Sequence, residues 1–400
     1  MKSTPEDLAP PQQFEPTNSR RQNDESVRDA SVRLLSTVGL EGTNFNSVSL
    51  DAGLSNSVLR KRFGNTDDLL VDVWKSRCFT AILLPISAVV ASYLSGSEAS
   101  PDPQSRALLN SLFEIEDVQF AGLEILAISA SHDQVMQAIA PDFLSLYSQE
   151  FIDSPIRQAQ FVVYFEFILG TLMHFRAQLL DRELVVARLH ELLSGAIVPA
   201  QELPIPEVDA SYIRQSFVPP AQSANYRLMN ACLDSVARYG FAQTTTKMIA
   251  KASGFSEGKL FASYPSKLEL FLDSVGCQIE AGFRANFEAT EQWTKQYGTS
   301  MSAAILFREY HRDDLDLQRA LQVEFLRLAW HRPDMFERRL AHVNRAMQAI
   351  GIADAGPSTP AQEVEQVMMT AGGTGALIVA RLDREAWRLP FAAATAKIYC

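Results

Sequence analysis

Apolar side chains recur along most of the chain at the spacing of an amphipathic α-helix, and glycine or proline ends many of these runs. Two such stripes stop at Gly39 and Gly240, because glycine readily adopts the positive φ that ends a helix. The alternation that marks a β-strand is scarce, so the pattern predicts an all-α protein. The two stripes consist of Val27, Ala30, Leu34, Leu35 and Val38, and of Leu228, Ala231, Val236 and Tyr239.

The residues around these two stops repeat each other at an offset of 201 positions, which is half the chain. The tetrapeptide at 180–183 also recurs at 382–385, an offset of 202. A period of this length predicts a whole protein duplicated end to end. The repeated positions are Gly39-Leu40, Ala52-Gly53-Leu54-Ser55, Leu59, Phe63 and Leu69-Leu70, which recur as Gly240-Phe241, Ser253-Gly254-Phe255-Ser256, Leu260, Tyr264 and Leu270-Phe271.

Breaks in the helical pattern divide the chain into six segments. A proline-rich stretch without periodicity opens the chain, and a second stretch with five prolines separates the halves. We expect a disordered arm over 1–22, a helix-turn-helix domain over 23–68 and a helical regulatory domain over 69–198. A linker over 199–222, a second helix-turn-helix domain over 223–269 and a second helical regulatory domain over 270–400 follow.

Composition argues against several classes of protein. No apolar run reaches about 18 uninterrupted residues, so we expect no membrane span. The four cysteines and six histidines are scattered without metal-type spacing, and no nucleophile–base pair or phosphate-binding glycine loop is recognisable. We therefore expect no metal, no cofactor and no enzymatic activity.

The formal net charge of −11 is unfavourable for a protein that meets nucleic-acid phosphates. Its distribution changes this picture, because residues 19–65 carry seven bases against five acids and residues 223–267 carry six bases against two acids. Two basic tips on an acidic body are compatible with contacts to DNA at the tips alone.

The second tip has the local signals of a helix-turn-helix. Gly254 stands where the turn needs a positive φ, and Ser256 can cap the helix that follows. That helix, over 257–263, is two turns long and would enter the major groove. A second capping serine, Ser266, precedes a long helix.

The second tip resembles the TetR/AcrR family of bacterial transcription regulators over about 45 residues. The resemblance is carried by Gly240-Phe241, Thr244-Thr245, Ile249-Ala250, Gly254-Phe255-Ser256, Gly258, Leu260-Phe261, Tyr264, Ser266-Lys267 and Leu270. Members of that family are usually half as long and work as homodimers, each with an N-terminal helix-turn-helix domain and a divergent helical domain that binds an inducer. The resemblance therefore implies two tandem TetR-like units, each a three-helix helix-turn-helix domain plus a ligand-binding and dimerisation domain, arranged as a pseudo-dimer.

Carried over to the second tip, the resemblance implies a set of DNA contacts. Thr245 and Thr246 would face the DNA backbone, and Lys267 would meet a phosphate at the positive end of its helix. The implied groove-facing residues are Glu257, Lys259, Phe261 and Ser263.

The first tip departs from the family pattern at Ser57, Arg60 and Thr66, where the family has glycine, an aromatic residue and lysine. Its candidate DNA contacts are Ser55, Asn56, Arg60, Lys61 and Arg62. Either this tip reads a different half-site, since arginine suits guanine edges, or it holds phosphates without specificity. We favour the first interpretation, and in both cases the operator would have unlike halves.

The helical bodies suggest an interface and a pocket. By resemblance, the aromatic-rich helix around 161–175 and the helix over 184–198 would pack against the glycine-rich segment 368–378 and a helix over 386–398, all within one chain. Weak candidates for an apolar or aromatic ligand are Phe113, Phe120, Leu123, Glu124 and Phe143 in the first copy, and Phe307, Tyr310, Phe325, Leu328 and Trp330 in the second.

These features favour a sequence-specific transcription regulator, most often a repressor, that a small-molecule inducer releases from a double-stranded DNA operator. We expect it in the bacterial cytoplasm, associated with the nucleoid and not with a membrane, and two chains could associate further into a homodimer. The alternative is a helical interaction or ligand-sensing protein that has lost specific DNA binding. Salt-sensitive, sequence-specific affinity for DNA would separate the two.

Overall fold

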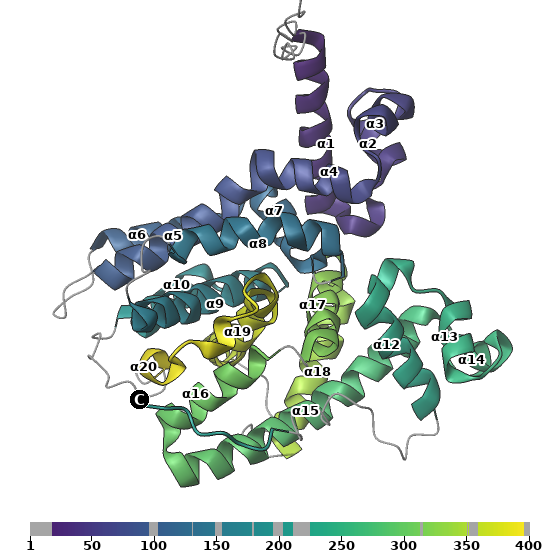
Figure 1. Ribbon diagram of the computed structural model, residues 1–400. Coiled ribbons are helices and arrows are strands. Elements are labelled where there is room, and N and C mark those ends of the chain that lie inside the picture. The colour runs from purple at the N-terminus through teal and green to yellow at the C-terminus, as the bar shows by residue number, and fades with distance from the viewer. Residues whose placement is uncertain are drawn as a thin grey trace, which may run out of the picture.

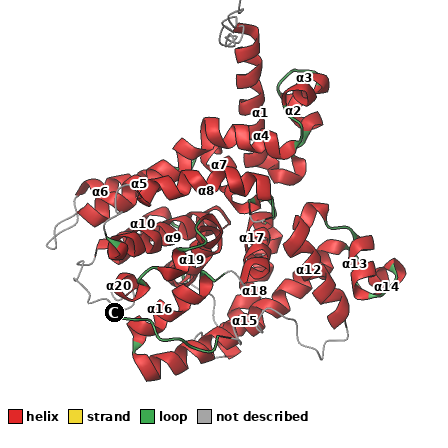
Figure 2. Cartoon of the chain, in the orientation of Figure 1, coloured by secondary structure: helices red, strands yellow, loops and turns green. Residues whose placement is uncertain are grey.

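The computed structural model describes residues 18–95, 103–129, 131–148, 154–177, 180–194, 203–210, 225–312, 315–349, 351 and 359–395. In these ranges every regular element is a helix, as predicted (Figure 2). We call residues 18–210 the first half and residues 225–395 the second half. The helices of the first half are α1 (Asn18–Gly42), α2 (Phe45–Asp51), α3 (Asn56–Arg62), α4 (Thr66–Val73), the π-turn η1 (Trp74–Cys78), α5 (Phe79–Ser95), α6 (Pro103–Leu112), α7 (Asp117–Ile128), α8 (Asp133–Ser148), α9 (Pro155–Ala177) and α10 (Arg182–Ser194).

The second half has a similar order of helices, in which α15 stands in the place of α4, η1 and α5. A longer helix followed by short ones opens each half, and these helices project at the top of the view in the first half and at its right in the second (Figure 1). We call residues 18–73 the first tip and residues 226–273 the second tip. The helices of the second half are α12 (Tyr226–Gln243), α13 (Thr246–Ser253), α14 (Glu257–Ser263), α15 (Lys267–Tyr297), α16 (Thr299–Tyr310), α17 (Asp316–Trp330), α18 (Pro333–Ala349), α19 (Pro360–Leu382), the 3-10 turn η3 (Ala386–Arg388) and α20 (Phe391–Thr395).

The two halves meet most closely where α9 crosses α19. A Cβ at Gly170 would overlap the carbonyl group of Ala371, and a Cβ at Gly375 would overlap that of Glu166. Only glycine lets two helix backbones come this close. The small residues of 368–378 therefore allow the close contact between α9 and α19, as the sequence analysis expected of them.

Helices α10 and α20 complete this interface, since α10 contacts α19 and α20 contacts α9. The helix expected over 386–398 is interrupted, with η3 separated from α20 by Leu389 and Pro390, and residues 396–398 lie outside the described residues. Proline cannot donate a helical hydrogen bond, and the residue before it disfavours the helical region, which accounts for the break.

The core is continuous across the interface. One cluster of buried apolar side chains runs through the first half and continues into α16, α17, α19 and α20. Trp330, at the end of α17, donates its indole N–H to the carbonyl oxygen of Met173 at 2.9 Å. A smaller cluster lies inside the second tip and its supporting helices.

The ends of the expected segments differ in places from the structure. Helix α1 begins at Asn18, inside the segment expected to be a disordered arm, while residues 1–17 lie outside the described residues. Of the expected linker, residues 203–210 run in an extended path along α16. Arg308 holds this path by donating to the carbonyl oxygens of Ile205 and Pro206 at 3.1 and 3.0 Å.

One helical stretch, Thr66–Ser95, is long and apolar enough to cross a membrane by length and composition alone. Its apolar side chains pack in the core of the first half, where Trp74, Leu83 and Ile86 are fully buried. This packing accounts for its composition, because a helix that is apolar on most sides suits the interior of a large helical domain.

Candidate nucleic-acid interface

The second tip has the geometry of a helix-turn-helix. Gly254, with φ of +72°, turns the chain between α13 and α14. The Thr245 hydroxyl accepts from the amide N–H of Met248 at 3.2 Å, and the Ser256 hydroxyl accepts from that of Lys259 at 3.2 Å. Both helices are therefore capped at their N-termini by side chains, which stabilises short helices that have few hydrogen bonds of their own.

Helix α14 buries one residue and turns most of the others to solvent. Leu260 is fully buried, whereas Phe261 is 52% exposed and Lys259 is also exposed. Glu257 accepts a hydrogen bond of 2.7 Å from the Thr246 hydroxyl, which joins the starts of α13 and α14. Lys259 and Phe261 are thus both exposed on a short, locally fixed helix, and their separation of two residues places them on different sides of it.

Lys267 points inward. Its ammonium donates to the carbonyl oxygens of Phe241 and Thr244 at 2.6 and 2.7 Å and lies 4.0 Å from the centre of the Phe241 ring. Partial burial lowers the pKa of this lysine. Two of its three N–H donors are used to join α15 to the end of α12, so its first role is to brace the tip.

The first tip has the same frame with different caps. Asn44 and Asn65 start α2 and α4, each in a reciprocal capping box. Gly53, with φ of +67°, makes the turn before α3. Ser55, in contrast to Ser256, makes no capping bond, and its hydroxyl lies 2.8 Å from that of Ser57. The start of α3 is tied instead by a hydrogen bond from Asn56 to Asn46 on α2.

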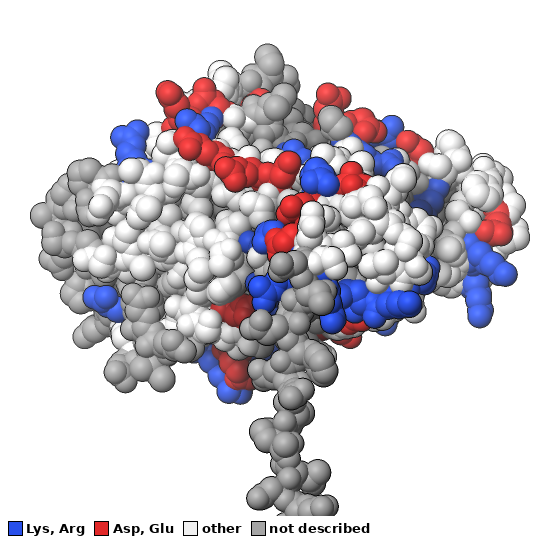
Figure 3. All heavy atoms as spheres, turned by 90° about the horizontal axis from the view of Figure 1, so that it is seen from above, with Lys and Arg blue, Asp and Glu red and all other residues white. Residues whose placement is uncertain are grey.

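The three cations at the end of α3 have different surroundings. The Arg60 guanidinium lies 5.6 Å from the centre of the Phe45 ring, and Arg62 pairs with Asp24 of α1 at 3.1 Å. Lys61 is exposed. All three cations are exposed, but Arg60 and Arg62 are also engaged with neighbouring side chains. In a view from above, Lys and Arg side chains gather in the lower middle and at the right edge, while many acidic residues lie along the upper part of the face (Figure 3).

A buried ion-pair network, which the sequence analysis did not foresee, lies behind both tips. The amide N–H of Leu40, after Gly39, donates to Glu124 on α7 at 2.9 Å. The amide N–H of Phe241, after Gly240, donates in the same way to Glu324 on α17 at 2.5 Å. Each glutamate thus holds the kink at Gly39 or Gly240 that lies near the end of the first helix of one tip.

Arg327 joins the two glutamates. Its guanidinium, almost fully buried, donates to Glu124 at 2.6 Å, to Glu324 at 2.7 Å and to Glu41, at the end of α1, at 3.0 Å. Burial alone would raise the pKa of Glu124, but Arg327 and further hydrogen bonds hold it below its usual value. Glu124 and Glu324 lie 200 residues apart, close to the offset that relates the two halves, and each lies within a mainly apolar helical stretch. This correspondence is the signal in the sequence that could have identified them.

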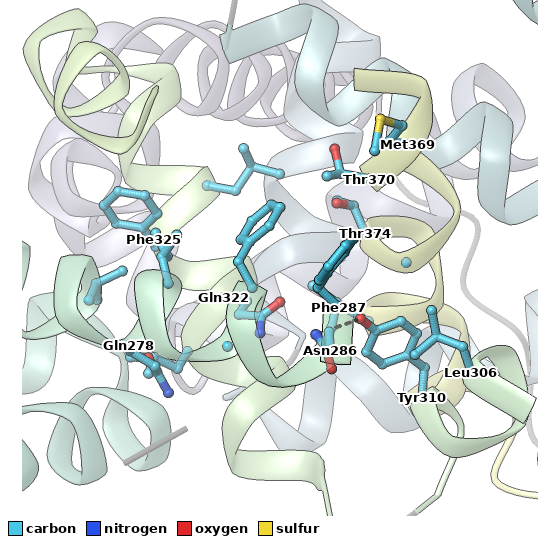
Figure 4. A pocket seen from close by; sticks show the side chains of 18 of the residues that line it. Gln278, Asn286, Phe287, Leu306, Tyr310, Gln322, Phe325, Met369, Thr370 and Thr374 are labelled. Atoms are coloured by element: carbon cyan, nitrogen blue, oxygen red, sulfur yellow. Dashed lines mark hydrogen bonds between the residues drawn. The ribbon is translucent and has the colours of Figure 1, made fainter. Parts of the chain in front are cut away.

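The second half also contains a cavity of about 350 Å³ between α15, α16, α17 and α19 (Figure 4). Three of the predicted ligand residues, Phe307, Tyr310 and Phe325, line it. The other seven lie elsewhere. Among them Glu124 belongs to the ion-pair network and Trp330 holds Met173, while Phe113, Phe120, Leu123, Phe143 and Leu328 are packing residues of other parts of the core.

Residues 228–273 match the family of bacterial regulatory proteins, tetR family. The matched segment runs from α12 into α15 and so covers the second tip, with Lys259, Phe261 and Lys267 inside it. The second tip is therefore similar to the matching segment of these bacterial regulatory proteins. The first tip lies outside the matched residues. No curated protein matches the chain.

Proposed function

We propose that the chain is a sequence-specific, DNA-binding transcription regulator, in which the two tips of one molecule replace the two tips of a TetR-family dimer. The observation that carries this proposal is the outer surface of α14, where Lys259 and Phe261 are exposed on a helix whose frame is capped and braced. Exposed cationic and aromatic side chains on such a helix suit contacts to phosphates and base edges in the major groove.

The shared frame of the tips supports the pseudo-dimer. Gly39 and Gly240 both have positive φ, and in both cases the next amide N–H donates to a glutamate of a body helix. The glycine contact between α9 and α19 supplies a close interface between the halves. The reading surfaces differ, so the preferred operator has unlike half-sites, spaced by about 34–36 Å if each tip enters a successive major groove.

The position of α17 supports release of DNA by a ligand. Leu321 and Phe325 on α17 line the cavity, while Glu324 and Arg327 on the same helix belong to the ion-pair network. A ligand that shifts α17 would therefore act on the turns of both tips. If the occupied conformer spaces the tips incorrectly for DNA, the ligand shifts the population off the operator, which is repression with induction.

The proposal gives the chain a binding role in the bacterial cytoplasm and no catalytic step. Its test is selection from a randomised duplex library by the full chain, with sequencing of the bound fraction. Lys259→Ala and Lys61→Ala variants are selected in parallel. We expect a two-part site with unlike halves, in which Lys259→Ala weakens enrichment of one half and Lys61→Ala weakens the other. Analytical ultracentrifugation of the DNA complex tests whether one chain or a homodimer occupies the site.

A second function has one observation in its favour. The pairing of Arg62 with Asp24 and the position of Arg60 over the Phe45 ring engage two exposed cations of the first tip with other side chains of the chain. This favours a protein whose tips serve protein contacts instead of DNA. If no sequence is enriched at any salt concentration, the regulator proposal fails and this interaction protein takes its place.

A further inference from the structure

The cavity of the second half is apolar at most of its wall. Phe283, Phe287 and Phe325 supply aromatic faces, and none of the described residues that line it is Asp, Glu, Lys, Arg or His. Burial raises the pKa of Tyr310 to about 12, so its hydroxyl is neutral at physiological pH. A charged ligand would lose its hydration here without gaining a counter-ion.

One corner of the cavity has unused hydrogen-bonding capacity. Asn286 donates its side-chain N–H to the Tyr310 hydroxyl at 3.3 Å, and both side chains face the cavity (Figure 4). The Asn286 Oδ1 atom is buried and has no hydrogen-bond partner in the described part of the chain. A buried acceptor without a partner costs free energy that a ligand donor can recover. The Tyr310 O–H, which accepts from Asn286, can itself donate to the ligand.

The corresponding region of the first half is closed. At the offset of 201 residues, Asn286 and Tyr310 correspond to Pro85 and Leu109, neither of which offers a side-chain hydrogen bond. Helix α7 packs directly on α5, since a Cβ at Gly122 would lie 2.6 Å from Cγ1 of Ile82. The void left beside Ile82 is too small to hold a water molecule.

We infer that the chain binds one uncharged, mainly apolar ring compound, carrying a hydroxyl group, in the second half only. The ligand hydroxyl donates to Asn286 Oδ1 and accepts from the Tyr310 O–H, while its rings lie among the phenylalanines. Met347 and Met369, whose flexible side chains also line the cavity, adapt to its outline. Because Met369 is 59% exposed, the cavity reaches the surface on α19. This inference specifies the inducer class of the proposed function.

The experiment is isothermal titration of the full chain, without DNA, with three probes of one shape: 2-naphthol, 2-methylnaphthalene and the anion 2-naphthoate. We expect 2-naphthol to bind once per chain, about tenfold tighter than 2-naphthoate. In Asn286→Leu and Tyr310→Phe the affinity for 2-naphthol should fall about fivefold, to that of 2-methylnaphthalene, whose own binding stays unchanged.

Location is tested with a matched pair of leucine substitutions. Leu306→Trp fills the cavity and should abolish binding, whereas Leu108→Trp, at a half-exposed site on α6, should leave it unchanged. Two sites per chain, equal binding of the anion, or no binding of any probe would each overturn the inference. The failure of the proposed function is distinguishable, since 2-naphthol would then still bind a protein that selects no DNA sequence.

Discussion

In the second tip, α14 turns Lys259 and Phe261 to solvent, whereas in the first tip Arg60 stacks on Phe45 and Arg62 pairs with Asp24. The frames that hold these helices are nevertheless alike. In both tips a glycine of positive φ makes the turn, and a body glutamate accepts from the amide after the first helix.

This difference shows that two parts of a tip can change separately. One is the frame, which consists of the glycine turns and the contacts that hold the helices, and the other is the set of exposed side chains on α3 or α14. The frame is fixed by backbone conformation and by one buried network that serves both tips, so a change there affects both. The exposed residues of α3 and α14 have no such constraint. Variants of the buried network shared by the tips should therefore act on both tips. Variants of a contact within one tip should act on the frame of that tip alone, and variants of the exposed residues should act on one half-site.

The largest effect is expected from Arg327→Ala. It leaves Glu41, Glu124 and Glu324 close together without their common cation, which should reduce the free energy of unfolding by about 3–5 kcal/mol. Hydrogen exchange should then speed up at the amides of both Leu40 and Phe241.

The matched control is Arg238→Ala, which breaks an exposed pair with Asp234 and should cost less than about 1 kcal/mol. If Arg327→Ala does not fold, Arg327→Lys keeps a charge and allows the same exchange measurement. Faster exchange at only one of the two amides would show that the tips are not joined through this residue.

Lys267→Met should loosen the second tip and leave the first tip unchanged. The loss of two charge-assisted hydrogen bonds to backbone carbonyls should cost about 2 kcal/mol. Amide exchange around 241–244 should increase while that around 40–43 is unchanged. The reciprocal variant Thr66→Lys places the same side chain in the first tip and should stabilise it by about 1 kcal/mol in chemical denaturation. Equal loosening of both tips by Lys267→Met would contradict the role of Lys267 as a brace of the second tip alone.

The reading surfaces are compared with Lys259→Ala and Arg62→Ala on the selected duplex. Lys259→Ala should weaken binding by about 1–3 kcal/mol if it contacts a base edge, with relaxed specificity in one half-site. Arg62→Ala should change affinity much less, because its guanidinium is engaged with Asp24. Fluorescence anisotropy over a range of salt concentrations measures both. A larger loss in Arg62→Ala would mean that the first tip reorganises its ion pair on DNA.

The smallest effect concerns the turn glycines. Gly53→Ala and Gly254→Ala each force alanine into a positive φ, which costs about 1 kcal/mol. A Cβ at Gly254 would also lie 2.5 Å from Nη2 of Arg227, which stacks on Phe255, whereas a Cβ at Gly53 meets nothing within 4 Å. Thermal denaturation should therefore show the greater loss for Gly254→Ala. Equal losses would show that Arg227 moves away without cost.

Much of the second tip could be predicted from the sequence because its signals are local. The bounds of α14, the turn at Gly254 and the cap at Ser256 all depend on residues within a few positions of one another. The direction of Lys267 was not predictable in the same way. A lysine at a helix start can meet a phosphate or fold back, and the choice depends on carbonyl groups more than 20 residues away.

The buried network and part of the cavity wall could not be predicted from the sequence. Arg327 has the sequence context of a surface arginine, and its partner Glu41 lies 286 residues away. The aromatic residues Phe307 and Phe325 could be assigned to the cavity wall from composition. Asn286 could not, because an asparagine on an amphipathic helix usually faces water, and only tertiary packing brings it inside.

The contact of Gly170 with Ala371 joins two regions of one polypeptide, so a mutation in either half occurs once per molecule. In a homodimer the same mutation would alter both sites at once. Under the proposed function, one half of the operator can change while the other half keeps the protein at the promoter. The protein and its target sequence could then evolve in single steps, without passing through an intermediate that binds nowhere.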